Sequence, residues 1–329
     1  MVRAVVIGGG TGSFTILSGL KHYVNDLTAL VSMADDGGST GQLRDELGVL
    51  PPGDVRQCLV ALACSPKVRD LFSYRFDSGS FKGHSFGNLF LTALEKMTGD
   101  FRAGVELATE VLQVAGKVEP ITLDKATLMM QDEDKVVRGE REIDDGVFVG
   151  RRPKLWLEGS LAAGPVVANP AALEAIQRAD LIIVAPGSLY TSLGAALVVP
   201  GIGAALKKSK AKKVYICNLV NKPGQTDRFV VQDYADELER MAGVRFLDYV
   251  VYNTRKPDAD LLEKYAADGE LPIDLGEKAK AGYALLGTDL LADEIWQGGS
   301  KADALAKVRT LIRHDPDRTA RKIMQIYFS

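Results

Sequence analysis

The sequence has few cysteines and histidines, and this shortage excludes two kinds of site. Its 329 residues include three cysteines and three histidines. Cys58, Cys64 and Cys217 are odd in number, and no two of them are spaced as C-x-x-C. A disulfide framework and a zinc site with the usual ligand spacing are therefore excluded. We expect a reduced, cytoplasmic protein.

A strong excess of charge and a long hydrophobic run are also absent. The formal net charge is -3, with 25% charged residues, which gives no reason to expect a nucleic-acid partner. The most apolar later stretch, Leu193–Leu206, is broken by glycines and a proline and is shorter than the roughly 20 residues that span a bilayer. We therefore expect no membrane insertion. The start, Met1–Ile7, is too short for a signal peptide. An exposed apolar element near Gly194–Leu206 would suit a homodimer.

Short, unbroken apolar runs recur along the chain and lead into polar or glycine-containing loops. Such runs are typical of strands buried on both faces of a parallel sheet. Strands are expected at residues 5–7, 27–33, 181–184, 214–219 and 249–252. Crossover helices are expected at residues 14–23, 55–63, 85–97, 102–114, 233–241 and 301–312. This alternation predicts one three-layer, Rossmann-like α/β domain over residues 1–329, with a mainly parallel sheet.

One region, residues 118–160, has a different pattern. "VEPITLDKATLMMQ" and "GVFVGRRPKLWLEG" alternate apolar and polar residues, which favours antiparallel strands. Because so short a region would have only a small core of its own, we interpret it as a β insertion within the α/β domain.

The stretch "VVIGGGTGSF" contains a strand, a glycine loop and the start of a helix. Glycines allow close approach to a ligand, and the first amides of the helix would point at an anion. The dinucleotide pattern G-x-G-x-x-G does not fit, because its third glycine would be Ser13 or Thr15, and the expected ribose-binding acid is missing. Phosphate contact is therefore favoured over a ligand-free turn, and a nicotinamide-dependent oxidoreductase is disfavoured.

Asp35 and Asp36 follow the second expected strand, at the sheet edge where ligands bind in open α/β folds. Two carboxylates beside a phosphate would repel it unless a cation lay between them. Mg²⁺ accepts one or two carboxylates together with phosphate oxygens, so this pair is a candidate Mg²⁺ site. The competing interpretation is that the pair shapes a turn. For Asp54, which begins another helix, a helix cap and a role in the site are equally favoured.

Other expected strand and helix ends carry polar residues as well. In "GHSFGNLFL", Ser85 is expected to cap a helix and Asn88 lies one turn inside it. "APGSLYTS" repeats the order of strand, glycine and hydroxyl-rich helix start, and Asn218 ends a later strand. Together, these strand ends predict a nucleotide-sized, polyanionic ligand.

Five motifs, "GGGTG", "ADDGGSTGQLR", "PPGDVRQCLVAL", "GHSFGNLFL" and "APGSLYTS", occur in the order found in the YvcK-type gluconeogenesis factors. The chain resembles that group over nearly its whole length. The group is related to CofD, the phospho-lactate transferase of deazaflavin coenzyme synthesis. The resemblance implies a Rossmann-like fold and a cytoplasmic protein that binds a nucleotide sugar such as UDP-N-acetylglucosamine. It also implies a role in carbon metabolism, cell shape and envelope synthesis.

The relationship to CofD implies an alternative function, in which a Mg²⁺-dependent transferase moves a phospho-lactyl group from a nucleoside diphosphate carrier. The metal-binding aspartate of CofD corresponds best to the pair Asp35 and Asp36. This chain has the YvcK form "ADDGGS", so catalysis is left open and no catalytic residue is assigned. Two late segments, "EKYAADGELPI" and "IRHDPD", also resemble the family. They imply a base- or sugar-binding face from Tyr265 and a charge for a diphosphate from Arg313, with core packing and helix-dipole pairing as the competing interpretations. The expected ligand-binding residues are Gly9, Gly10, Thr11, Gly12, Asp36, Gly38, Ser39, Asn88, Gly187, Ser188, Tyr190, Thr191, Asn218, Tyr265 and Arg313.

Overall fold

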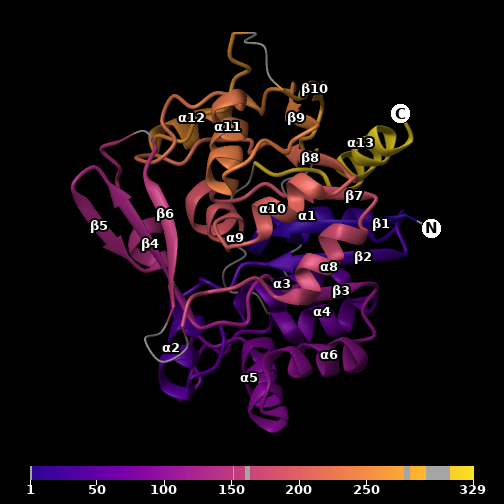
Figure 1. Cartoon of the computed structure of the whole chain (residues 1–329), viewed down its shortest axis with the longest axis vertical. Helices are drawn as coiled ribbons and strands as arrows, with labels where there is room; N and C mark the ends of the chain where they lie inside the picture. The colour runs from indigo at the N-terminus through magenta and orange to yellow at the C-terminus, as the bar shows by residue number, and fades with distance from the viewer. Residues whose placement is uncertain (1, 151, 160–163, 278–281, 294–311) are drawn as a thin grey trace.

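A parallel sheet forms the centre of the molecule in the computed structural model, which describes residues 2–150, 152–159, 164–277, 282–293 and 312–329 (Figure 1). Within these ranges the sheet has seven strands in the order β10-β9-β8-β7-β1-β2-β3, and every neighbouring pair is parallel. The strands are β1 (Arg3–Gly8), β2 (Asp26–Val31), β3 (Lys117–Pro120), β7 (Leu181–Val184), β8 (Lys212–Ile216), β9 (Tyr249–Asn253) and β10 (Ala284–Thr288). All five strands expected from the sequence are present.

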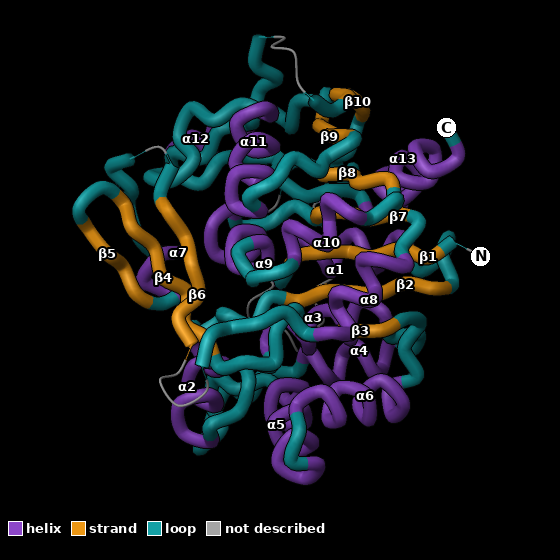
Figure 2. The backbone as a smooth tube through the Cα atoms, in the orientation of Figure 1, coloured by secondary structure: helices purple, strands orange, loops and turns teal. Residues whose placement is uncertain are grey.

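Helices cover both faces of this sheet, so the expected three-layer α/β fold is confirmed (Figure 2). One layer includes α1 (Gly10–Leu20), α3 (Gly53–Leu62), α6 (Phe101–Leu112) and α13 (Pro316–Phe328). The other includes α8 (Pro170–Arg178), α10 (Ile202–Lys208) and α11 (Val231–Ala242). Outside the β insertion, the remaining helices of the described ranges are α2 (Gly38–Leu47), α4 (Pro66–Ser73), α5 (Phe86–Thr98), α9 (Ala195–Leu197) and α12 (Ala259–Ala267), with the π-helix η1 (Leu189–Gly194). The helix expected at residues 301–312 lies almost entirely outside the described ranges.

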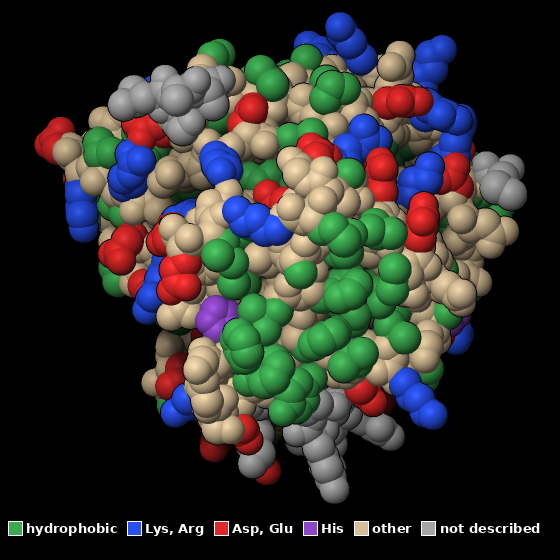
Figure 3. Space-filling view, turned by 90° about the horizontal axis from the view of Figure 1, so that it is seen from below, with side chains coloured by type: hydrophobic (Ala, Val, Ile, Leu, Met, Phe, Trp, Pro, Cys, Tyr) green, Lys and Arg blue, Asp and Glu red, His purple; other side chains and the backbone are tan. Residues whose placement is uncertain are grey.

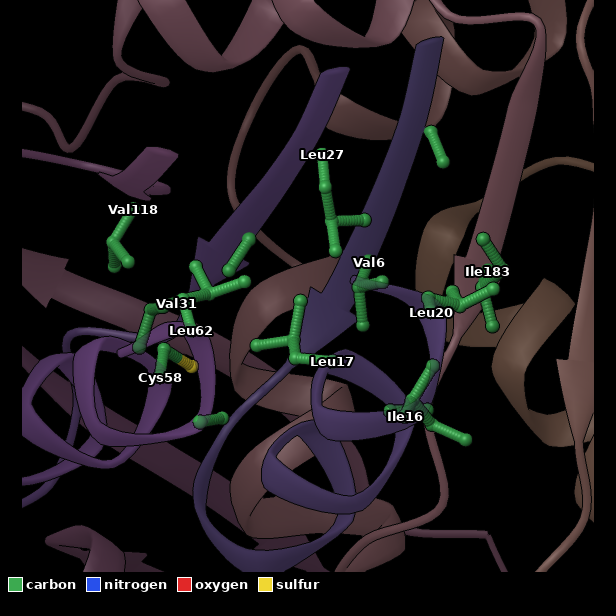
Figure 4. Close-up of a cluster of buried hydrophobic side chains, with 14 of the residues drawn as sticks. Val6, Ile16, Leu17, Leu20, Leu27, Val31, Cys58, Leu62, Val118 and Ile183 are labelled. Carbon is green, nitrogen blue, oxygen red and sulfur yellow. The ribbon is translucent and has the colours of Figure 1, made fainter. Parts of the chain in front are cut away.

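Strand β1 shows why short apolar runs become central strands. Successive side chains point to opposite faces of a sheet, so Val6 packs with Leu17 of α1 in one core, whereas Val5 and Ile7 pack in the other. Figure 4 shows Val6 and Leu17 in the first of these cores. Burial of each such side chain contributes about 1.5–3 kcal/mol, and a strand without polar alternation gains this on both faces.

The β insertion is a three-stranded antiparallel sheet in the order β5-β4-β6 with a short helix, α7 (Glu140–Asp144). Its strands are β4 (Ala126–Asp132), β5 (Lys135–Arg138) and β6 (Lys154–Gly159). It stands at the left of Figure 1, on the side opposite to the N-terminus. The expected start at residue 118 is too early, because β3 pairs with β2 in the main sheet. A short edge strand and an antiparallel strand have the same alternating pattern.

The expectation of an exposed apolar element near Gly194–Leu206 is wrong. Ala196, Ile202 and Leu206 are completely buried within the chain. A hydrophobic area instead lies on part of the underside of the molecule (Figure 3). Exposed hydrophobic side chains on α4, α5 and their connection include Leu71, Tyr74, Phe81 and Met97. Homodimer formation stays a prediction.

Within the described ranges, no single helix is long and apolar enough to cross a membrane. The bent pair Leu189–Leu197 and Ile202–Lys208 passes the same test only when the two segments are taken together.

Candidate functional site

The candidate site lies at the point in the parallel sheet where the order of the strands reverses. β1 and β7 are neighbours; β2 continues the sheet on one side of them and β8 on the other. Open α/β sheets bind ligands beyond the carboxyl ends of their strands at such a point. Both strands end in glycine-containing turns, and the turns touch: a Cβ on Gly12 would lie 1.7 Å from the carbonyl oxygen of Pro186. Only glycine allows this contact, so the two turns form one surface.

A recess of about 160 Å³ opens at these turns. The predicted residues Thr11, Gly12, Gly187, Asn218 and Arg313 all line it. The amide of Gly187 donates to Asn218 Oδ1 at 3.2 Å, and Asn218 Nδ2 donates to the Gly187 carbonyl at 2.7 Å. Asn218 therefore fixes the backbone of the second turn. Backbone amides and a guanidinium around one small recess can bind a phosphate.

Arg313 is held in place through the residues on both sides of it. The amide of Ile312 donates to the Tyr265 hydroxyl at 3.0 Å, and His314 Nε2 donates to the Cys217 carbonyl at 3.0 Å. Burial lowers the pKa of His314 to about 4, so its ring stays neutral. The Tyr265 ring is only 7% exposed and packs in the core. Tyr265 therefore positions the segment that carries Arg313 instead of offering an open face to a base.

A larger cavity of about 700 Å³ adjoins the recess and shares Asn218, Leu219 and Ile312 with it. Its lining comes from the ends of β8 and β9, the loop before α11, and residues 271–274. This volume is within the range of small-molecule sites. The recess and the cavity together form a site with a small end at the two glycine turns and a wider end beside it.

Asp36 anchors the β insertion. Its carboxylate accepts hydrogen bonds from the amides of Glu140 at 3.1 Å and Arg141 at 2.8 Å, and it lies 3.9 Å from Arg44 Nη1. These amides open helix α7, where a carboxylate satisfies unpaired N–H groups and the helix dipole favours its charge. The carboxylate that the sequence suggests as a metal ligand is thus engaged with a helix.

Asp54 lies against the first glycine loop instead of capping its own helix. The N-cap of α3 is Pro52, and no side chain caps it. A Cβ on Gly9 would lie 2.1 Å from Asp54 Oδ2, so glycine is required where the carboxylate meets the loop. Burial raises the pKa of Asp54 to about 7, and the neighbouring Asp35 carboxylate adds to the rise. Burial also raises the pKa of Asp35, which accepts the Gly37 amide at 3.0 Å.

The pair Asp35 and Asp54 fits a bound Mg²⁺. Both carboxylates have raised pKa values, because the charges of Arg44 near Asp35 and Arg56 near Asp54 only partly offset desolvation, and Mg²⁺ needs only one or two carboxylates when phosphate oxygens and water complete its shell. No group of three or more candidate ligands that could hold a metal ion occurs in the described part of the chain.

Helix α7 adds two acids that the sequence gave no reason to select. Asp144 accepts hydrogen bonds from the hydroxyls of Ser188 at 3.1 Å and Thr191 at 2.7 Å, and it pairs with Lys222. Burial raises the pKa of Glu140 to about 8, and the charge of the Asp35 carboxylate adds most to this rise after burial. A five-residue helix has no useful periodicity, so only the three-dimensional structure reveals these contacts.

The remaining predicted residues lie elsewhere. Asn88 is 2% exposed; it accepts from Arg56 Nε at 2.9 Å and donates to Ser39 Oγ at 3.4 Å. It thereby joins α5 to α3 and to the start of α2, where Gly38 is exposed. Tyr190 is completely buried, so its ring is not open to a ligand in this structure. Ser85 is confirmed as the cap of α5, accepting the Asn88 amide at 3.2 Å. Neither Asn88 nor Ser39 lines the recess or the larger cavity.

Comparison with known proteins identifies the family. The family model described as 2-phospho-L-lactate transferase CofD matches residues 4–291. The chain belongs to the CofD family. Within it, the chain is 46% identical over 270 residues to a relative from Thermotoga maritima, covering 82% of this chain and 84% of that one. It is 38% identical over 328 residues to the gluconeogenesis factor of Bacillus subtilis, covering 98% of both chains.

A solved structure extends this family assignment to the fold. The crystal structure of a UPF0052 family member from Bacillus halodurans superposes with a TM-score of 0.87 at 36% identity. The match covers 98% of this chain and 100% of that one. The chain is therefore a CofD-family protein whose close relatives include the gluconeogenesis factors.

Proposed function

We propose that this CofD-family protein is a gluconeogenesis factor that binds a nucleotide sugar of the UDP-N-acetylglucosamine type. It would act as a regulatory protein in carbon metabolism, cell shape and envelope synthesis. In this proposal, the diphosphate lies in the recess at Gly12, Gly187 and Arg313, and one end of the ligand extends into the larger cavity.

One observation carries the proposal: a small recess between two glycine turns shares three lining residues with a cavity large enough for a nucleoside or a sugar. A nucleotide sugar has a matching layout, because its small diphosphate is joined to two larger groups, the nucleoside and the sugar. The names of the relatives support the metabolic role, whereas the identity of the ligand is our inference from the site and from the resemblance.

Titration calorimetry with UDP-N-acetylglucosamine, GDP and NAD, each with and without Mg²⁺, tests the proposal. We expect the uridine nucleotide to bind most tightly. Arg313→Gln should weaken that binding about tenfold or more, because a charged hydrogen bond to phosphate is lost. Arg178→Gln is the matched control, since Arg178 pairs with Glu174 on α8, outside the recess and the cavity. Binding that is absent below millimolar concentration, or equal loss in both variants, would contradict the proposal.

The acid pair favours a second function, a transferase of phosphorus-containing groups. Asp35 and Asp54 would hold Mg²⁺ close to the Gly9 turn, and a bound Mg²⁺ would neutralise charge on a transferring phosphoryl group. The remaining contribution of the chain would be to position the nucleotide carrier. Asp54→Asn should then abolish turnover of a phospho-lactyl guanosine diphosphate carrier while UDP-N-acetylglucosamine binding persists. Turnover that survives this change would exclude the mechanism.

A further inference from the structure

The loop between β8 and α11 carries an arginine in a left-handed backbone conformation. Arg228 has a φ of 60°, and it lines the larger cavity. The other non-glycine residues with positive φ in the described ranges are Gln113 and Glu133. Gln113 is the C-cap of α6, and Glu133 lies in the turn between β4 and β5, where such conformations are ordinary. Arg228 also lies in a turn, which the Phe229 amide closes by donating to the Thr226 carbonyl at 3.1 Å, and its side chain is exposed.

The structure around Arg228 imposes this conformation. Asp227 accepts hydrogen bonds from Asn221 Nδ2 at 3.0 Å and from the Gly224 amide at 2.7 Å. On the other side, Phe229 is buried. A left-handed conformation is unfavourable for a residue with a long side chain and persists only where its neighbours fix it. The neighbouring contacts therefore fix the backbone of Arg228 where the residue lines the cavity.

The charges that line the cavity leave this guanidinium available. The cationic lining residues are Arg228, Arg255 and Lys256, and the anionic one is Asp274. Arg255 is engaged with Asp289 at 3.3 Å and belongs to a network of ion pairs. Within the described ranges, no hydrogen bond or ion pair joins the Arg228 or Lys256 side chain to another residue. The residues that line the cavity thus carry a surplus of positive charge.

We propose that Arg228 binds an anionic group that lies beyond the second phosphate of the nucleotide. The site would then prefer a ligand with a carboxylate on its sugar, or a third phosphate, over its uncharged counterpart. This inference rests on the proposed function, because the diphosphate in the recess directs the next group into the cavity. The loop fixes the backbone of Arg228 beside the cavity, and its guanidinium can hold either anion bidentately.

Two matched pairs of ligands test the inference by calorimetry. UDP-glucuronate and UDP-glucose differ by a carboxylate, and UTP and UDP differ by a phosphate. In one pair, we expect the member with the additional anionic group to bind about tenfold or more tightly than its counterpart. This difference is the effect of one charged hydrogen bond. The pair that shows the difference identifies the anion. Arg228→Gln should remove the preference without changing the affinity for UDP-glucose more than about twofold, and Arg228→Lys should retain part of it.

Arg228→Gly and Glu133→Gly separate binding from backbone strain. Both substitutions relieve a positive φ, so both proteins should unfold at an unchanged or higher temperature. Only Arg228→Gly should lose the preference. Equal affinities within both ligand pairs, or a preference that survives in Arg228→Gln, would refute the role of Arg228 while the nucleotide-sugar proposal stands. A protein that binds none of the four uridine nucleotides would overturn both.

Discussion

The buried carboxyl of Asp54 should make the protein less stable as the pH rises. Its pKa is raised from 3.8 to about 7 by burial beside Asp35. The unfolded chain ionises at the lower value, so the native state holds an extra proton between the two pKa values. The free energy of unfolding should therefore fall from about pH 4 to pH 7 and level off above it. At 1.36 kcal/mol per pKa unit, the fall attributable to this group is about 4 kcal/mol.

Urea denaturation at pH 5 and pH 8, followed by circular dichroism, measures this effect. Asp54→Asn should be more stable than the wild type at pH 8 by about 2–4 kcal/mol, with a smaller change between the two pH values. Mg²⁺ should stabilise the wild type at pH 8 but not Asp54→Asn, because the ion binds the ionised pair. Asp45→Asn, an exposed acid on α2, is the control. The reasoning would be refuted by a wild type that gains more stability from pH 5 to pH 8 than Asp54→Asn does. It would also be refuted by an Asp54→Asn variant with the same pH dependence as the wild type.

Three further predictions concern individual hydrogen bonds, two of them around the site. Asp36→Asn should weaken the anchoring of α7 by about 1 kcal/mol, seen as faster amide exchange in the first turn of that helix, and unchanged exchange there would contradict it. Tyr265→Phe should weaken uridine-nucleotide binding through the displaced arginine segment, whereas Tyr23→Phe, which loses a surface bond, should not. Ser85→Ala should lower the free energy of unfolding by about 1 kcal/mol in urea denaturation, with nucleotide affinity unchanged.

The fold was predictable because burial on both faces leaves a direct pattern in the sequence. β1 and β7 contain only apolar residues between their ends. A strand buried on both faces needs such a run, whereas a helix or strand with one exposed face does not. The same reasoning failed for Gly194–Leu206, because apolar composition does not distinguish a buried turn of helix from an exposed one. The order of turns after β1 and β7 was also sufficient to locate the recess at the carboxyl edge.

The roles of the individual acids were not predictable, because their partners are distant in sequence. Asp36 meets amides 104 and 105 residues away, and Asp54 meets the Gly9 turn, 45 residues before it. The local sequence made Asp54 a plausible helix cap and gave Asp35 and Asp36 the same surroundings. Only the approach of the β insertion engages Asp36 and leaves Asp35 beside Asp54.

The contacts of α7 also bear on the order in which the chain folds. On one side this helix bonds to Asp36, more than 100 residues earlier, and on the other to Ser188 and Thr191, which are 44 and 47 residues later. Contacts across long sequence separations form slowly, because the entropy of closing the loops is lost before the contacts can stabilise them. Docking of α7 would therefore follow formation of both halves of the main sheet, as one of the last steps of folding.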